Sequence, residues 1–522
     1  MTDIYLVTAE PWLPAAGVVG RLDAATTPGM TTAPGDLPPD HVFPPTLVSP
    51  GNIERHLFRS GTTRGRSEVG FGAVVLNNAD GALDPAADWG FDGRAITLRR
   101  GRVGDAYPAA FSLVWVGVMD QAEVDWRRVS LRVRDRQAEV IDRPIQSDLY
   151  GGTNQLPNGI DGTPEDLQGK RKPVMFGRVR NAAVPLVNSA KLVYQLSCDG
   201  LSAVSAVYDR GAALGLGSSR GSVANLLATN PAPGTFDWVL ADSAGAFIRL
   251  GSAPAGQITV DAIAGATPAD RTVAAIQRCI LERLGTLGPA DFDLASFGQL
   301  MAAVPAEVGL YAGTDPITTG DALDLLAGSI GAWWTVTRLG AFRVGRLSDP
   351  ALATPSARIE AWQVLAGDGG ISRIATADTG GGIPVWRVQV RYDRNWAPTS
   401  ETGLAGIALS RIAWLREEYR TVVTDSAAVL LAHPRGVELS IDTLLTTKAD
   451  AEAEAERLST LYGRRRDWLA VPLPIEHARD LDLGDVVDLA VPRYGLSAGK
   501  RCVILGLIED FERGQTTLHL WG

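Results

Sequence analysis

The segment 217–221 has the spacing of a serine nucleophile, glycine-x-serine-x-glycine, with Ser219 at its centre. Such a serine is activated only where a strand enters and a helix leaves a strained turn, and where a histidine can accept its proton. The preceding residues 211–216 are mostly glycine and alanine, which make a poor strand. We therefore interpret the segment as a flexible glycine and serine loop.

A general base would have to come from the five histidines, which are His41, His56, His433, His477 and His519. None of them has a carboxylate residue at a spacing that suggests a catalytic pair. The sequence also contains no HExxH motif, no phosphate-binding loop and no dinucleotide fingerprint after a strand. It therefore predicts no catalytic residue and a protein that is not an enzyme.

Acidic residues are the remaining candidates for chemistry. Asp80, Asp84, Asp88 and Asp92 recur every four residues, but an EF-hand calcium loop needs ligands at alternate positions and a closing glutamate. We interpret Asp80 and Asp84 as turn formers. A pair of glycosidase carboxylates needs only proximity in space, and the sequence gives no reason to choose one pair.

Two further groups of polar residues have plain structural interpretations. The segment 482–489 could supply an acidic site, but Leu-Gly-Asp is a turn sequence and an apolar strand follows. Cys198, Cys279 and Cys502 lie far apart without a CxxC pair, which indicates reduced, buried thiols rather than a zinc or iron–sulfur site. The sequence predicts no metal and no cofactor.

The composition limits the classes of protein to which the chain can belong. The chain has 522 residues, a formal net charge of −10 and 45% hydrophobic residues, enough for roughly three or four domains. A chain with a negative net charge is not expected to bind the phosphate backbone of nucleic acid, but nucleic acid can pass along it without being held. The start of the chain lacks a secretory signal, and the most apolar short run, 113–119, is too short to span a bilayer. We expect no membrane insertion.

Hydrophobic periodicity divides the chain into four regions. Period-two alternation, as at Val114, Val116 and Val118, predicts strands over 1–150, the first tube-like β-barrel region. Loop-rich β structure is expected over 151–260, a small α/β domain over 261–355, and a second barrel region over 356–522, interrupted by a helix at 447–463. The predicted fold class is mainly β with α+β insertions.

The helices are predicted from their caps. Thr267 and Asp270 form a capping box before an apolar stripe that includes Ile276 and Ile280 and ends at Gly285. A second helix is expected over 321–329, and a β-hairpin follows with its turn at Leu339-Gly340. Thr447 and Asp450 cap the helix at 447–463 in the same way.

Two distant stretches follow one pattern. The first contains strands around Gly93, Gly117 and Leu131, and the second contains strands around Gly484, Gly506 and Leu518. A glycine in the middle strand is typical of a bulge or bend where a sheet curls. We expect two related barrels, one near each end of the chain, which superposition of the two regions would test.

Several segments resemble tail proteins of siphophages and related prophages. In chain order these are 78–84 (Asn-Ala-Asp-Gly-Ala-Leu-Asp), 93–94 (Gly-Arg), 150–152 (Tyr-Gly-Gly), 172–177 (Lys-Pro-Val-Met-Phe-Gly), 391–396 (Arg-Tyr-Asp-Arg-Asn-Trp), 414–419 (Trp-Leu-Arg-Glu-Glu-Tyr), 482–487 (Asp-Leu-Gly-Asp-Val-Val), 492–496 (Pro-Arg-Tyr-Gly-Leu) and 518–522 (Leu-His-Leu-Trp-Gly). The resemblance touches most of the chain, and the order of the segments carries it because no single one is specific.

The resemblance implies a trimeric baseplate hub at the virion tail tip, made in the host bacterial cytoplasm. In the hub family each subunit carries two tube-like β-barrels, so three subunits match the sixfold tube above them. The implied partners are the distal tube ring protein, the tape measure protein and fibre or tip proteins, with DNA passing through without specific binding. The family offers no catalytic residue and no cofactor.

Two alternatives stay open. The chain could be a glycan-cleaving enzyme of the tail tip, which paired carboxylates in a cleft would favour. It could also be a receptor-binding or carbohydrate-binding tail module that uses Trp89, Trp333 or Trp334 as stacking platforms. For these tryptophans, core packing is the plainer interpretation.

Overall fold

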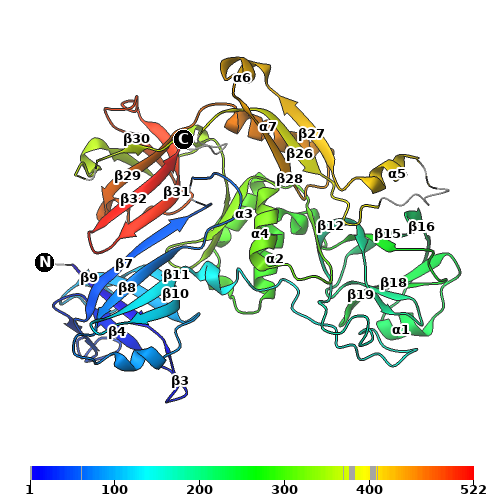
Figure 1. The fold of residues 1–522 in the computed structure, drawn as a ribbon, viewed down its shortest axis with the longest axis horizontal. Coiled ribbons are helices and arrows are strands. Elements are labelled where there is room, and N and C mark those ends of the chain that lie inside the picture. The colour runs from blue at the N-terminus through cyan, green and yellow to red at the C-terminus, as the bar shows by residue number, and fades with distance from the viewer. Residues whose placement is uncertain (1–2, 60, 368, 376–381, 400–406, 408) are drawn as a thin grey trace.

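The fold is mainly β with α+β insertions, as the sequence predicts. The computed structural model describes residues 3–59, 61–367, 369–375, 382–399, 407 and 409–522. Figure 1 shows the first and last parts of the chain side by side, a helical region next to them, and a further group of strands on the far side.

The first 140 residues form a sheet that curls around an apolar core. Its strands run in the order β7-β8-β11-β10-β9-β1-β4, and β1 returns close to β7. Inward side chains such as Trp115 and Leu131 fill the interior. The elements are β1 (Asp3–Ala9), β2 (Trp12–Leu13), β3 (Val18–Val19), β4 (Leu22–Ala25), β5 (Met30–Thr31), β6 (Val42–Phe43), β7 (Leu47–His56), β8 (Phe71–Asn77), η1 (Asp84–Asp88), β9 (Ala95–Arg102), β10 (Ser112–Val124), β11 (Arg128–Arg134) and η2 (Arg136–Glu139).

The last part of the chain completes the same sheet. Strand β31 pairs antiparallel with β7, with Gly506 opposite His56, so that 13 strands from both ends of the chain share one sheet (Figure 1). Backbone hydrogen bonds therefore join the two terminal regions. The elements are η5 (Pro350–Leu352), β24 (Ala357–Glu360), η6 (Ala361–Gln363), β25 (Ser372–Arg373), β29 (Trp468–Pro474), α8 (Ile475–Ala478), β30 (Val486–Ala490), β31 (Lys500–Asp510) and β32 (Gln515–Trp521).

In place of two separate closed barrels, the described residues form this single shared sheet. No ladder among them joins its end strands β4 and β25. The reason lies in β31, which is 11 residues long. Its first half pairs with β30 and its second half with β7, so the strand that begins the C-terminal sheet also continues the N-terminal one.

The two repeated stretches are both three-stranded antiparallel meanders, β9-β10-β11 and β30-β31-β32. In β10 the register shifts on either side of Gly117, and in β31 it shifts directly before Gly506. The predicted strands are present, and the irregularity lies directly before the central glycine in β31, whereas in β10 Gly117 itself pairs regularly with Ile96. That the two meanders superpose stays a prediction.

Residues 174–263 form two packed sheets around a separate core. One runs β16-β15-β20-β12-β21 and the other β13-β14-β19-β18-β17. The elements are β12 (Val174–Ala183), β13 (Leu186–Asn188), β14 (Val193–Ser197), β15 (Ala203–Asp209), β16 (Ala212–Ala213), β17 (Gly215–Ser219), α1 (Val223–Ala228), β18 (Thr235–Asp242), β19 (Gly245–Leu250) and β20 (Ile258–Ile263), with β21 (Gly309–Ala312) joining from the next region.

The next region is helical, as expected, but its first helix begins later than predicted. The capping box of Thr267 and Asp270 closes the short helix η3 (Pro268–Arg271), and Thr272 caps α2 (Val273–Arg283). The helix predicted over 321–329 is α4 (Thr319–Gly328), and the predicted hairpin is β22 (Ala332–Val336) with β23 (Phe342–Arg346). The structure adds η4 (Pro289–Asp291) and α3 (Leu294–Ala303).

A three-stranded sheet covered by the predicted C-terminal helix completes the fold. The helix is α7 (Lys448–Tyr462), with Thr447 as its cap and Gly463 at its end. It packs on a sheet ordered β27-β26-β28. The elements are β26 (Val385–Tyr392), α5 (Leu409–Arg416), β27 (Arg420–Asp425), α6 (Ala427–Ala432) and β28 (Val437–Asp442).

Candidate functional site

The first three residues of the glycine-x-serine-x-glycine segment end strand β17 rather than lying in the predicted loop, and Arg220 and Gly221 follow the strand. Ser219 is exposed at the end of β17 and pairs with Trp238 of β18. The neighbouring carboxylate, Asp237, accepts a hydrogen bond from the Ser218 amide (2.7 Å) and pairs with Arg220 (2.7 Å). These contacts fasten the edge strand to the sheet, because the carboxylate is occupied by the arginine.

Two histidines have the carboxylate partners that their spacing did not reveal. The Nε2 atom of His41 lies 2.7 Å from Asp23, and that of His56 lies 2.9 Å from Glu54. Both pairs belong to the N-terminal sheet region, whereas Ser219 lies in β17. The structure therefore does not bring either pair together with the candidate serine.

Most of these acidic residues and cysteines have the structural roles that the sequence predicts. Asp80 and Asp84 hold the turn before η1, and the Asp482 amide donates to Asp485 (2.8 Å) in the predicted turn. All three cysteines are free, but only Cys502 is buried, while Cys198 is half-buried and Cys279 is exposed. The expectation of buried thiols is wrong for Cys279, which faces outward from α2.

The tryptophans proposed as stacking platforms pack in the protein. Trp333 and Trp334 are buried, and Trp334 donates its indole N–H to Asp324 (2.7 Å). Trp89 is half-buried against the core of the N-terminal sheet. Core packing is thus confirmed for Trp333 and Trp334.

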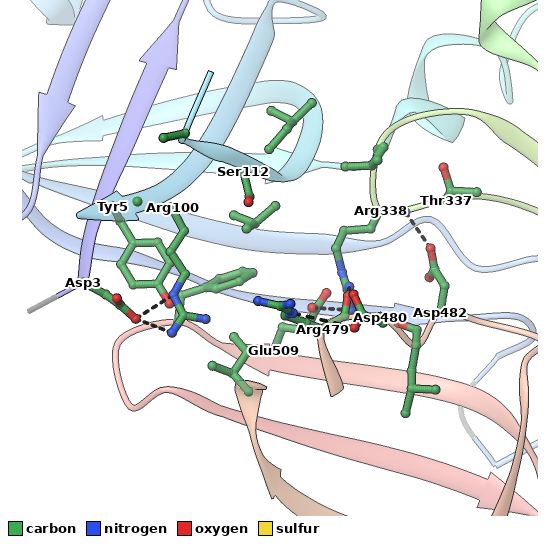
Figure 2. A pocket seen from close by; sticks show the side chains of 18 of the residues that line it. Asp3, Tyr5, Arg100, Ser112, Thr337, Arg338, Arg479, Asp480, Asp482 and Glu509 are labelled. Carbon is green, nitrogen blue, oxygen red and sulfur yellow. Dashed lines mark hydrogen bonds and ion pairs between the residues drawn. The ribbon is translucent and has the colours of Figure 1, made fainter. Parts of the chain in front are cut away.

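A cavity lies where three parts of the chain meet. It has a volume of about 750 Å³. Figure 2 shows Asp3, Tyr5 and Arg100 of the N-terminal sheet on one side, and Arg338 of the β22–β23 turn with Asp482 of the C-terminal region on the other. Apolar side chains, among them Leu113, Val114, Leu339 and Phe511, complete the lining.

Ion pairs that involve the lining residues Arg338, Asp482 and Glu509 lie beside this cavity. Arg55 of β7 pairs with Asp482 (2.8 Å), and Arg338 pairs with Glu509 of β31 (2.8 Å). Arg55 also lies 3.6 Å from Glu509, so one chain of charges links all four residues. Arg55 and Glu509 are each only 1% exposed. Removing one partner would leave an uncompensated buried charge, so these pairs hold three regions of the protein in one arrangement.

The surroundings set the protonation of these groups. Burial raises the pKa of Asp482, but the nearby Arg55 and Arg338 outweigh it, and the net result is a lowered pKa. Burial likewise opposes the charge on Arg55, while Asp482 and Glu509 leave its pKa above the usual value. Asp485 differs, because burial dominates and raises its pKa. The Arg55–Asp482 pair is therefore fully charged at neutral pH.

The charge network was missed from the sequence, although one signal was available. Ile53 and Arg55 alternate on one face of β7, and Leu57 continues this period of two directly after the strand. Ile53 and Leu57 are buried apolar residues. An arginine at an apolar position of a period-two pattern indicates a buried, paired cation. Its partner, Asp482, lies more than 400 positions away along the chain, and no local pattern names it.

The arrangement is suited to fastening strands together. The buried Glu509 carboxylate is held by an arginine, and so is that of Asp482. Among the described residues, no group of three or more His, Cys, Asp or Glu side chains is placed to hold a metal ion. Within the same described part of the chain, none of the helices has the length and apolar character needed to cross a bilayer.

Comparisons with known proteins find structural likenesses without sequence matches. No family model matches the chain, and no curated protein matches it. A chain of the virion of a native gene transfer agent particle is 17% identical, with a TM-score of 0.43, over 68% of this chain and 85% of that one. A tail protein from Neisseria meningitidis MC58 is 11% identical, with a TM-score of 0.37, over 99% and 96%.

A third solved structure, the 43 kDa tail protein of prophage MuSo2 from Shewanella oneidensis, is 10% identical, with a TM-score of 0.39, over 100% of this chain and 98% of that one. The proteins named in these comparisons are components of phage tails and of a virion, the class that the sequence resemblance indicates. Because all three TM-scores lie below 0.5, we draw nothing further about this chain from them.

Proposed function

We propose that this chain is a structural, non-enzymatic hub subunit of a bacteriophage tail tip. The observation that carries the proposal is the shared sheet, in which the meanders β9-β10-β11 and β30-β31-β32 lie in one continuous wall. A subunit that presents two similar wall segments can match a ring of sixfold symmetry with half as many copies as that ring has subunits. Three such subunits would present six segments to a sixfold tube.

Closure of the wall between copies would also protect the sheet. Open edge strands expose unpaired N–H and C=O groups that pair readily with other chains. A ring of subunits removes such edges, as barrels do. The ordered segments that resemble siphophage and prophage tail proteins support the same class, and the four-region division of the chain remains part of the proposal.

The proposed channel lets DNA pass without holding it. The net charge of −10 opposes binding to phosphate. On β11 the outward arginines are paired across the hairpin, Arg132 with Glu123 and Arg134 with Asp120, which reduces their attraction for a polyanion. The proposed partners are further copies of the chain, the distal tube ring protein, the tape measure protein and fibre or tip proteins.

The symmetry of the protein in the particle tests this proposal. Electron microscopy of tails that contain the tagged chain should place a threefold ring at the tip, directly below the tube. Deleting the gene for this chain should leave tails without an organised tip. A monomer bound at the outside of the tail, or turnover of host glycans by the purified chain, would contradict the proposal.

A further inference from the structure

Two histidines meet across the strand that joins the two ends of the chain. Gly506 of β31 lies opposite His56 of β7 on one side and opposite His519 of β32 on the other. The centroids of the two imidazole rings are 5.2 Å apart, and their planes are inclined by 46°. Strands on either side of a third strand lie about 9.5 Å apart, so the rings can meet only because glycine places no side chain between them.

The surroundings of His519 disfavour a positive charge on its ring. The Nδ1 atom is buried and has no hydrogen-bond partner, so a proton on it would have no acceptor. The neighbouring ring, His56, is only 2% exposed, which leaves little water between the two. Burial, followed by the charge on protonated His56, lowers the pKa of His519 to about 4. The His519 ring is therefore neutral at neutral pH.

One carboxylate opposes these effects. Glu54 of β7 accepts a hydrogen bond from the Nε2 atom of His56 (2.9 Å), and its negative charge favours protonated His519. The Glu54 side chain is 32% exposed, so water weakens its attraction for the more distant ring. Burial and the second histidine therefore outweigh the carboxylate.

The elements packed against β32 add no further charge beside His519. Strands β31 and β29 place Gly506 and Ala470 opposite it, and neither residue titrates. The short helix α8 also contacts β32 and carries the titratable residues Glu476 and His477. Neither of them shifts the pKa of His519, which is set by burial, His56 and Glu54.

We propose that the histidine pair is an acid-sensitive joint, at which protonation of His519 opens the ladder between β7 and β31. Opening separates the two rings and exposes Nδ1 to water, so the charged form is relieved of both costs. The change can stay local, because β7 keeps its pairing with β8, and β31 keeps its pairing with β30 and β32. This inference goes beyond the proposed function and does not rest on it, since it concerns a joint within one chain.

The direction and size of the effect follow from the two protonation states. Neutral His519 stabilises the closed ladder fully above the ordinary pKa of 6.5, and this contribution is lost as the pH falls through about 4. With the ordinary pKa in the open state, the ratio of open to closed molecules should rise roughly 30-fold between about pH 7.5 and pH 5.

Hydrogen exchange measured by mass spectrometry at these two pH values tests the joint. After correction for the intrinsic exchange rates, the protection of residues 52–56 and 506–510 should fall roughly 30-fold at the lower pH. The protection of residues 388–390 in the separate sheet of β26 should stay constant. His519→Gln, which does not titrate in this range, should remove the pH dependence. His433→Gln, at the end of α6, is the matched control and should keep it.

Each outcome decides the matter. If the protection of the two segments is equal at both pH values in wild type, or falls as much in His519→Gln, the joint is overturned. If His519→Gln does not fold, as judged by circular dichroism at pH 7.5, His519→Val replaces it as the variant without a titrating group. A threefold ring in the particle would keep the hub whichever result is obtained, so the two proposals fail separately.

Discussion

Arg338 and Glu509 meet across two regions of the protein, with 2.8 Å between the guanidinium and the carboxylate. Arg338 belongs to the turn between β22 and β23, and Glu509 lies near the end of β31. The backbone of Arg338 also accepts a hydrogen bond from the Val116 amide and donates one to Asp482. One residue thus connects the helical region with the N-terminal and the C-terminal parts of the shared sheet.

Loss of this connection should be costly. We expect Arg338→Ala to lower the free energy of unfolding by about 3 kcal/mol, because it leaves the Glu509 carboxylate buried without its closest cation. Arg358→Ala is the control, since Arg358 pairs with Asp488 at the surface and should cost less than about 1 kcal/mol. Urea denaturation of both variants checks the difference, and equal losses would contradict the role of the buried pair.

Gly506 should tolerate no side chain. A Cβ at this position would overlap the imidazole of His56 and approach His519 from the other neighbouring strand. We expect Gly506→Ala to destabilise the protein by roughly 1 to 3 kcal/mol through overpacking. Gly298→Ala, in the exposed middle of α3 with open space around it, should instead add roughly 0.5 to 1 kcal/mol. If thermal denaturation shows that the melting temperatures of both variants change in the same direction, this expectation is contradicted.

Asp324 should give the stability a pH dependence of definite sign. Burial raises its pKa to about 6, so protonation is favoured in the folded state. Its contribution is present below the unfolded pKa and is lost as the pH rises through about 6. Asp324→Asn keeps the Oδ1 acceptor that Trp334 and Ser67 use, without the charge. Between about pH 4 and pH 7, we expect wild type to lose roughly 1 to 3 kcal/mol relative to this variant. If the free energies of unfolding of wild type and variant change with pH in parallel, the pKa of the Asp324 carboxyl is not raised.

Trp333 should behave as a core residue. Its ring fills the space beside Gly345 and Gly484, so Trp333→Ala should cost about 3 to 5 kcal/mol and leave a cavity. Because Trp362 is exposed, Trp362→Ala should lower the free energy of unfolding by only about 0.5 kcal/mol or less. Guanidinium denaturation measures both. Unchanged stability of Trp333→Ala together with lost binding to host glycans would instead favour a stacking platform.

The sequence predicts the elements whose signals are local. Period-two alternation indicates β10 and β11, the helix expected over 321–329 corresponds to α4, and the capping pair of Thr447 and Asp450 indicates α7 within one or two residues. Helix α3 was missed, although Asp293 caps it and Phe297 and Leu300 lie on its buried side. The start of α3 could have been inferred from Asp293, and its buried side from the three-residue spacing between Phe297 and Leu300.

The arrangement of these elements could not be predicted in the same way. Periodicity shows which face of a strand is buried, but it does not name the partner strand. The pairing of Arg55 with Leu507, and of β7 with β31, joins segments separated by about 450 residues. The cavity and the ion pairs beside it depend on that pairing, so the sequence alone does not reveal them.

The ladder between β7 and β31 has a consequence for how the molecule is made. During synthesis, the β7 edge of the N-terminal sheet stays without its partner strand until residues 506–510 leave the ribosome, about 450 residues later. A prematurely terminated product would carry that edge permanently and pair with whatever strand it met. The solubility of the N-terminal sheet therefore depends on a strand that is synthesised about 450 residues after it.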